Sequence, residues 1–324
     1  MTYRAFAYFQ SLEGHSSNVL SLAITDDKQT LVSGDSAGII KIWNLPTGEL
    51  QRTFEGHRSS ITGIVTSKDS QRLVSSSMDR TIKIWHLPTG RLQQTLTGKD
   101  MDWLHCVTLS PDERYILGGD KAGIIRIWDF VTGKLEQIWT AHDQRNWSNS
   151  IRELVFTADG KTLISCSFDK TIRVWEMPAG RLVRTLTGHT DVITSIILGS
   201  KERSNEQILI SGSWDESVRI WDWKTGEQKQ QLGGYAGKVP MGPIHPTYGT
   251  TPSRPTVRCI AISSDGETIF SGDELRQITI WDRTSGKIQQ VLSQSASPVL
   301  GLLLIDENTF ATGGGRNVDI WRRP

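Results

Sequence analysis

The stretch that decides the fold is residues 56–96, which read GHRSSITGIVTSKDSQRLVSSSMDRTIKIWHLPTGRLQQTL. Four short β-rich runs lie within it, at residues 61–65, 72–75, 81–85 and 92–96. Turn-forming residues separate the runs, as in Lys68-Asp69-Ser70 and Pro88-Thr89-Gly90, and none of the runs has a helical period. The stretch therefore predicts four short strands in an antiparallel meander.

The same unit occurs seven times along the chain. Each third run ends in a tryptophan, and these are Trp43, Trp85, Trp128, Trp175, Trp221, Trp281 and Trp321. The intervals between them are 42, 43, 47, 46, 60 and 40 residues, and most are close to the roughly 40 to 45 residues of a four-stranded propeller blade. The longer intervals indicate inserted loops, at about 143–150, 199–206 and 233–256.

These repeats predict an all-β fold, a seven-bladed β-propeller with four antiparallel strands per blade that forms a single domain over residues 1–324. Residues 8–12 read like the fourth strand of a unit, and the seventh unit has only its first three strands. We expect this N-terminal strand to complete the last blade, because the ring then has no open sheet edge.

Composition and charge restrict the class of protein. Lys and Arg total 36 against 35 Asp and Glu, so no whole-protein field attracts nucleic acid or a membrane. Residues 1–10 lack a signal sequence, and the longest apolar stretch, 299–305, is too short to span a bilayer. Three cysteines, Cys106, Cys166 and Cys259, without CxxC spacing favour reduced thiols and a cytoplasmic protein over disulfides or zinc.

Paired residues at the unit boundaries resemble those of the WD40 repeat family. They are Gly14-His15, Gly56-His57 and Gly188-His189, together with the Trp-Asp pairs at 128–129, 221–222 and 281–282. The resemblance covers nearly the whole chain. It implies a rigid propeller whose loops bind other macromolecules.

The resembling family joins a turn His, a second-strand Ser or Thr, a turn Asp and the third-strand Trp by hydrogen bonds within a blade. In three units Asp and Ser stand six and ten residues before the Trp. The resemblance thus implies three structural networks: His57, Ser75, Asp79 and Trp85; His142, Ser165, Asp169 and Trp175; His189, Ser211, Asp215 and Trp221. Because these histidines recur at the repeat period and do not converge, we expect no metal or catalytic role for them.

The first and third units depart from this pattern. Ala37 and Ala122 replace the turn Asp, and Lys99 replaces the His of the third unit, so we expect both blades to lack the network. Asp occurs instead two residues earlier in these units, and also in the sixth, at Asp35, Asp120 and Asp273. The sequence assigns no role to these three aspartates.

Catalytic motifs are scarce. Residues 34–38 match the G-x-S-x-G nucleophile elbow of serine hydrolases, but that elbow joins a strand to a helix, whereas residues 39–43 read as a strand. No HExxH, Walker or GxGxxG motif occurs in a suitable context. We therefore expect no enzyme activity, no cofactor and no metal site.

A candidate binding surface follows from the register of the repeats. The turn positions before the repeating Asp, the starts of the innermost strands and one inserted loop should share a face of the ring, and they carry Met78, Lys121, Phe168, Trp214, Trp103, His105, Arg152, Arg258 and Trp147. Singly exposed apolar residues are common on any protein. Here, however, Trp and Arg from adjacent units gather, and these residue types dominate binding hot spots.

The sequence thus favours a non-catalytic scaffold or adaptor that binds protein or peptide partners, within a multiprotein complex, without membrane insertion and with no small-molecule substrate. A regulatory subunit or a nucleic-acid-binding propeller remains an alternative, although Arg145, Trp147, Arg152 and Arg258 make only a fragment of a basic stripe. An enzyme would have to rely on His105, Arg152, Arg258 and Glu274 near the central channel.

Overall fold

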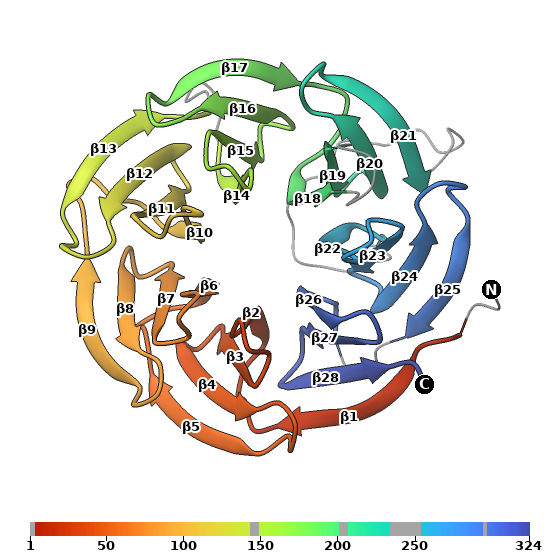
Figure 1. The fold of residues 1–324 in the computed structure, drawn as a ribbon, viewed down its shortest axis with the longest axis horizontal. Helices are drawn as coiled ribbons and strands as arrows, with labels where there is room; N and C mark the ends of the chain where they lie inside the picture. Colours follow the sequence, from red (N-terminus) through yellow and green to blue (C-terminus); the bar gives the residue numbers. More distant parts are fainter. Residues whose placement is uncertain (1–3, 143–148, 201–206, 234–253, 294–296) are drawn as a thin grey trace.

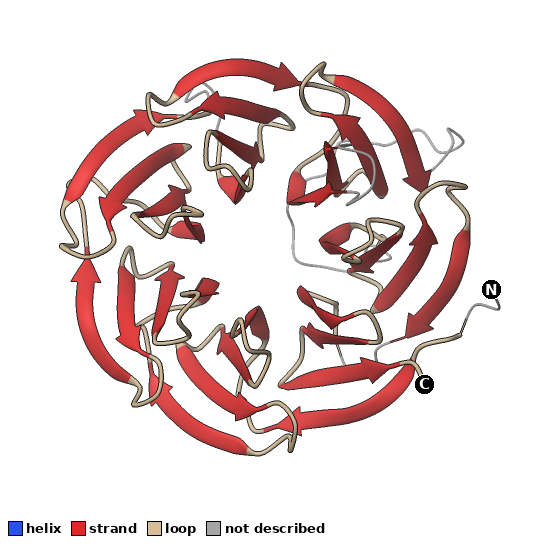
Figure 2. Ribbon diagram, in the orientation of Figure 1, coloured by secondary structure: helices blue, strands red, loops and turns tan. Residues whose placement is uncertain are grey.

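The chain forms a ring of seven four-stranded antiparallel sheets, which confirms the predicted seven-bladed propeller (Figure 1). The computed structural model describes residues 4–142, 149–200, 207–233, 254–293 and 297–324. Within these ranges every regular element is a strand, and no helix has the length and apolarity required to cross a membrane (Figure 2). The undescribed stretches include most of the expected loops at 143–150, 199–206 and 233–256, among them Trp147 and Arg145.

Each blade runs outward from the central channel to the rim. Blade 1 comprises β2 (Val19–Ile24), β3 (Thr30–Asp35), β4 (Ile39–Asn44) and β5 (Leu50–Glu55); blade 2, β6 (Ile61–Thr66), β7 (Arg72–Ser77), β8 (Ile82–His86) and β9 (Arg91–Leu96); blade 3, β10 (Leu104–Leu109), β11 (Tyr115–Asp120), β12 (Ile124–Asp129) and β13 (Leu135–Thr140); and blade 4, β14 (Ile151–Phe156), β15 (Thr162–Ser167), β16 (Ile172–Glu176) and β17 (Arg181–Leu186).

The remaining blades follow the same order, except for the last. Blade 5 comprises β18 (Ile193–Ser200), β19 (Gln207–Ser213), β20 (Ser217–Asp222) and β21 (Glu227–Gly233); blade 6, β22 (Val257–Ile262), β23 (Thr268–Asp273), β24 (Gln277–Asp282) and β25 (Ile288–Ser293); and blade 7, β26 (Gly301–Asp306), β27 (Thr309–Gly313), β28 (Asn317–Arg322) and the N-terminal β1 (Ala7–Glu13).

The N-terminal strand closes the ring. β1 pairs antiparallel with β28 from Ala7 opposite Arg322 to Glu13 opposite Asn317, so the first and the last strand lie side by side in blade 7 (Figure 1). Just before β1, Phe6 is buried and exchanges hydrogen bonds of 2.7 and 2.8 Å between its backbone and the side-chain amide of Gln290 in blade 6. The closing segment therefore contacts two blades.

The hydrophobic core lies between neighbouring blades. In β8, Ile82 and Ile84 are buried against blade 3 and Trp85 is buried against blade 1, as expected of a sheet that is covered on both faces. Val74 and Ile84 of blade 2 pack in one cluster with Trp128 of blade 3, and similar clusters occur around the ring. Since each blade shares its core with both neighbours, the ring holds its loops in fixed relative positions.

Candidate interaction surface

Three blades contain complete hydrogen-bonded networks. In blade 2, Trp85 Nε1 donates to Ser75 Oγ at 2.9 Å, Ser75 Oγ lies 2.7 Å from His57 Nε2, and His57 Nδ1 lies 2.9 Å from Asp79 Oδ2. Blades 4 and 5 repeat this arrangement with His142, Ser165, Asp169 and Trp175, and with His189, Ser211, Asp215 and Trp221.

The networks of blades 4 and 5 keep their aspartates charged and their histidines neutral. Burial lowers the pKa of His142 and of His189, so each ring is neutral. Its Nδ1–H donates a hydrogen bond to the carboxylate, and its Nε2 accepts a hydrogen bond from the Ser hydroxyl. Against the opposing effect of burial, hydrogen bonds, first those from the histidines, lower the pKa of Asp79 and of Asp215. All polar atoms of the histidines are thereby used inside the blade.

The expectation that blade 1 lacks such a network is wrong. His15 Nδ1 lies 2.8 Å from Asp35 Oδ2, His15 Nε2 lies 2.7 Å from Ser33 Oγ, and Trp43 Nε1 donates to Ser33 Oγ at 2.8 Å. The other carboxylate oxygen, Asp35 Oδ1, accepts the N–H groups of Ala37 and Ile39 at 2.9 Å. Asp35 therefore fixes the turn and binds the histidine at once.

Blade 3 uses a buried ion pair in place of the network. Asp120 Oδ1 accepts the N–H groups of Ala122 and Ile124, while Asp120 Oδ2 binds Arg126 Nη1. Both side chains are almost fully buried, and Arg126 Nη2 also donates to the carbonyl of Asp100 at 3.1 Å. Gly118 stands where the other blades have Ser or Thr, and Trp128 Nε1 has no hydrogen-bond partner in the described chain.

The aspartate of blade 6 has only the turn role. Asp273 Oδ1 accepts the N–H of Gln277 at 2.8 Å, and burial raises the pKa of the carboxyl. The three aspartates to which the sequence assigned no role thus share one function, since each begins a turn between the second and third strands and binds N–H groups of that turn.

The G-x-S-x-G match is a turn between two strands. β3 ends at Asp35 and β4 begins at Ile39, whereas the hydrolase elbow requires a helix after the serine. Ser36 Oγ lies 2.5 Å from Ser17 Oγ, and Gly38 has a φ of +87°. A β-carbon at Gly38 would lie 2.2 Å from the carbonyl oxygen of His57, so glycine is required there by the approach of the next blade's loop.

The described members of the predicted binding set lie on one face of the ring, which we call the loop face. On this face the turn between the second and third strands is tied to the loop that enters the innermost strand. Phe168 N–H donates to Ser150 O at 3.0 Å, and the corresponding bonds, of 2.8 to 3.1 Å, run from Met78, Lys121, Trp214 and Glu274 to Ser60, Trp103, Val192 and Thr256. The repeated bond holds both kinds of segment side by side.

Five of the predicted residues form, together with Glu274, a continuous chain of contacts that we call the central cluster: His105, Arg152, Phe168, Trp214, Arg258 and Glu274. Arg152 Nη1 lies 3.2 Å from His105 Nδ1, and the Arg152 guanidinium lies 5.5 Å from the Phe168 ring centre. The Phe168 and Trp214 ring centres are 5.5 Å apart. Arg258 stacks on Trp214 at 4.9 Å and pairs with Glu274 at 2.6 Å.

The cluster spans four blades, because its members come from blades 3, 4, 5 and 6 in order around the channel. Beside it, Lys121 Nζ lies 4.2 Å from the ring centre of Trp103, which is 41% exposed. Met78 occupies the matching turn of blade 2 and is half-buried. Trp147 lies outside the described residues.

The electrostatics of the cluster differ from residue to residue. Burial, followed by the charges of Arg152 and Lys121, lowers the pKa of His105 to about 3, so this ring is neutral near pH 7 and accepts a hydrogen bond from Arg152. Burial lowers the pKa of Arg152, and the charge of Arg258 acts in the same direction. Arg152 and Arg258 both line the channel cavity, so two guanidinium groups border the same space.

One titratable side chain on the channel wall was missed by sequence reasoning. Glu153 follows Arg152 on β14 and turns toward blade 5, where Oε2 accepts the N–H of Ile196 at 2.6 Å. Burial raises the pKa of Glu153 to about 7. No periodic signal could have revealed it, because the other innermost strands have no acid at this position.

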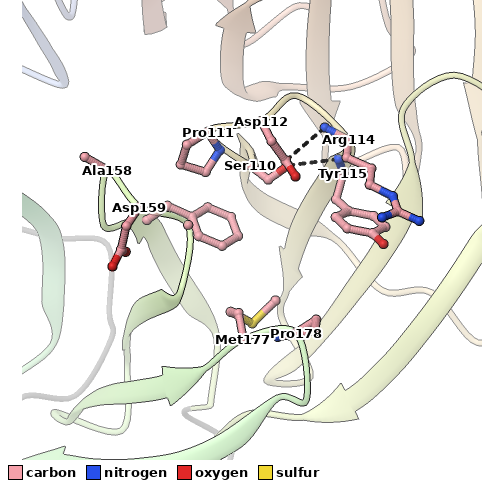
Figure 3. Close-up of a pocket in the computed structure, with 11 residues that line it drawn as sticks. Ser110, Pro111, Asp112, Arg114, Tyr115, Ala158, Asp159, Met177 and Pro178 are labelled. Carbon is pink, nitrogen blue, oxygen red and sulfur yellow. Dashed lines mark hydrogen bonds between the residues drawn. The ribbon is translucent and has the colours of Figure 1, made fainter.

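Two cavities differ in the residues that line them. A channel cavity of about 300 Å³ is lined by His105, Arg152, Glu153 and Arg258, among others. On the opposite face, a pocket of about 400 Å³ lies between turns of blades 3 and 4 (Figure 3). There Ser110 Oγ donates to Asp112 Oδ1 at 2.5 Å, a turn that blade 4 repeats with Thr157 and Asp159, so the polar groups of this pocket stabilise its own turns.

Metal-ligating side chains do not gather in the described ranges, which contain no group of three or more His, Cys, Asp or Glu placed to hold an ion. The three cysteines are unpaired and buried. Burial raises the pKa of Cys106 and of Cys259 well above the ordinary thiol value, which makes them weak nucleophiles near neutral pH.

The ring, its blade networks and its repeats define a class of protein, and comparison with known sequences names it. The family model described as WD domain, G-beta repeat matches residues 7–44, 48–86, 90–129, 133–176, 180–222 and 245–282. The chain therefore belongs to the WD40 family. The structure contains one blade more than the six matched repeats, because β1, β26, β27 and β28 form the seventh.

The chain is similar to parts of several larger proteins. Autophagy-related protein 16 of Arabidopsis thaliana is 26% identical over 172 residues, 52% of this chain and 29% of that protein. Apoptotic protease-activating factor 1 of Rattus norvegicus is 24% identical over 259 residues, 68% and 18% of the two chains. Nuclear distribution protein nudF of Emericella nidulans is 46% identical over 59 residues, 18% and 13%. The chain spans less than a third of the length of each relative.

Proposed function

We propose that this protein is a non-catalytic scaffold that binds a protein or peptide partner on the loop face, around the central cluster. The observation that carries the proposal is the ring pair Phe168–Trp214, which joins blades 4 and 5 and has an arginine packed at each end. Trp and Arg are the residue types most enriched in binding hot spots. A rigid ring presents them already ordered, which reduces the entropy lost on binding.

The chemistry of the titratable groups supports a binding role over an enzymatic one. His15, His57, His142 and His189 are engaged inside their blades. His105, the histidine at the channel, has a pKa of about 3 and is too weak a base for proton transfer near neutral pH. We also propose a cytoplasmic location, which the unpaired, buried cysteines favour.

Affinity capture with the full chain tests the scaffold proposal. Proteins captured from an extract of the native cell would be quantified by mass spectrometry for the wild type, Trp214→Ala and Phe168→Ala. Val131→Ala is the matched control, because Val131 is 68% exposed in a turn of the opposite face. We expect both aromatic variants to lose the same captured proteins while Val131→Ala retains them and all melting curves agree. Equal capture by all four chains would reject this surface.

A further inference from the structure

Arg152 has no carboxylate partner among the residues that the structure describes. Among the described residues, its guanidinium donates only to the uncharged Nδ1 of His105, and no carboxylate lies within ion-pair distance. Buried charges in proteins are normally paired, because an unpaired one carries a large desolvation penalty. Arg152 therefore retains both charge and hydrogen-bonding capacity for a group from outside the chain.

The neighbouring charges do not compensate Arg152. Arg258 is matched by Glu274, with 2.6 Å between Nε and Oε2. Lys121, stacked on Trp103, adds a positive charge at the edge of the cluster. Glu153 lies on the same strand as Arg152, but its carboxyl binds the backbone of Ile196, and its raised pKa of about 7 reduces its negative charge.

Space for a ligand exists beside these groups. The channel cavity of about 300 Å³ is lined by His105, Arg152 and Arg258, and this volume is about ten times the roughly 30 Å³ that one water occupies in the liquid. It can admit a carboxylate-bearing side chain. The sequence of residues 234–253 contains no Asp or Glu, and residues 143–148 contain only Asp143.

We propose that the loop face binds an acidic segment of a partner protein, with one Glu or Asp carboxylate of that segment inserted at the channel mouth against Arg152 and Arg258. The inference rests on the scaffold function proposed above and specifies the chemistry of the partner. A guanidinium suits this ligand because its planar donors match the two oxygens of a carboxylate.

The arrangement favours an acidic peptide over a nucleic acid or a phosphorylated one. At the channel cavity, Arg152, Arg258 and Glu274 together leave one positive charge, which matches the single charge of a carboxylate. A phosphate monoester carries about −1.5 to −2 and would also have to draw on Lys121, which is engaged with Trp103 at the edge of the cluster. Binding of single-stranded nucleic acid depends on open aromatic faces for base stacking. Phe168 and Trp214 instead contact each other, and Arg152 and Arg258 stack on them.

The test uses the full chain and fluorescein-labelled peptides read by fluorescence anisotropy. The probes are octaglutamate, octaglutamine, a phosphoserine peptide of equal length and a single-stranded oligothymidylate. The protein variants are Arg152→Met and Arg258→Met, with Arg80→Met and Arg276→Met as controls, because these two arginines are exposed in turns of the same face. Asp143→Asn is included to detect competition by the chain's own acid. Thermal melts verify that each variant folds.

The expected result is that octaglutamate binds and octaglutamine does not. Arg152→Met and Arg258→Met should each weaken binding at least tenfold, whereas the control arginine variants change it less than twofold. Three results would overturn the inference: no binding of octaglutamate by the wild type, equal loss from the control variants, or tighter binding of the phosphoserine peptide or the oligothymidylate. A tenfold gain from Asp143→Asn would do so too, because Asp143 would then be the natural ligand of Arg152.

The same variants separate this inference from the scaffold proposal. If the captured proteins are lost with Trp214→Ala and Phe168→Ala but retained by Arg152→Met, the loop face is the binding surface and the acidic ligand is wrong. If Trp214→Ala and Phe168→Ala also retain them, the scaffold proposal fails as well.

Discussion

His15 Nδ1 lies 2.8 Å from Asp35 Oδ2, although Asp35 stands two residues before the position from which aspartate binds histidine in blades 2, 4 and 5. Asp35 begins the turn, as Ser77 does in blade 2, and in both turns the N–H three residues later donates to the carbonyl at 3.2 Å. The carboxylate therefore reaches the same place in space from a different place in sequence. Blades 1, 2, 4 and 5 all keep a carboxylate beside the histidine.

Asp35→Ala should strongly destabilise the protein. The substitution removes a buried acceptor that binds the buried His15 and two partly buried turn N–H groups, and we expect a loss of about 3 to 5 kcal/mol in the free energy of unfolding. Asp26→Ala is the control in the same blade, because Asp26 is exposed, and it should change the value by less than about 0.5 kcal/mol. Denaturant unfolding measures both. Similar stabilities would show that Asp35 is dispensable.

Arg126→Met should cost about 3 to 5 kcal/mol, because it leaves Asp120 charged and buried without its partner. Adding Asp120→Asn should recover part of this loss, since an asparagine still accepts the turn N–H groups but carries no charge. Lys134→Met, which breaks the exposed pair with Glu136 in the same blade, should cost less than about 1 kcal/mol. A double variant no more stable than Arg126→Met alone would contradict the unpaired-charge explanation.

Glu153→Gln should be more stable than the wild type above pH 7 and similar to it near pH 4.5. Burial raises the folded-state pKa to about 7 from an ordinary 4.5, so the folded state retains a proton that the unfolded state has released, and wild-type stability is lost as pH rises between these values. The gain at pH 8 should be about 1 to 3 kcal/mol, since Gln can still accept the Ile196 N–H.

Unfolding of Glu153→Gln and wild type at pH 5 and pH 8 checks this pH dependence. Glu136→Gln, whose carboxylate is 38% exposed on the rim, is the control and should show the same difference from wild type at both pH values. Equal stability of Glu153→Gln and wild type at pH 8 would mean that burial does not raise the free energy of the charged Glu153 carboxylate.

Deleting residues 1–13 should lower the melting temperature, because it removes β1 and the buried side chains of Phe6 and Leu12. The ring centre of Phe6 lies 5.6 Å from that of Phe270 and 5.2 Å from that of Phe310. Truncation of such a buried ring to alanine typically costs about 3 to 5 kcal/mol in the free energy of unfolding. A synthetic peptide of residues 1–13 should raise the melting temperature again, and the same peptide with Leu12→Asp should not. An unchanged melting curve after deletion would show that β1 does not hold the ring.

The sequence predicts the fold well because the propeller is periodic. The offset from Asp79 to Trp85 recurs in other blades, since antiparallel register fixes where the turn lies relative to the third strand. The six-residue offset from Asp to Trp did not identify Asp35, because it places the aspartate at one turn position only. A carboxylate at the start of the turn also reaches the histidine.

The sequence predicts which residues share the loop face, but it does not predict which of their side chains contact each other. Register places Arg152, Phe168 and Trp214 on one face, but the stacking of Arg258 on Trp214 of the preceding blade depends on side-chain conformations that the repeat does not encode. Likewise, Glu153 binds the backbone of Ile196, 43 residues away, in the neighbouring blade. Interactions between blades at single positions carry no periodic signal.

The pairing of β1 with β28 also orders the events of synthesis. Residues 7–13 leave the ribosome before blades 1 to 6, but their partner strand, residues 317–322, follows after all six of these blades. Blades 1 to 6 can each form from local hairpins as they are translated, whereas the seventh has high contact order and must wait until residues 317–322 have been made. Until then, β1 is an unpaired strand in the nascent protein, and this is the stage at which the protein is most exposed to misassociation with another copy.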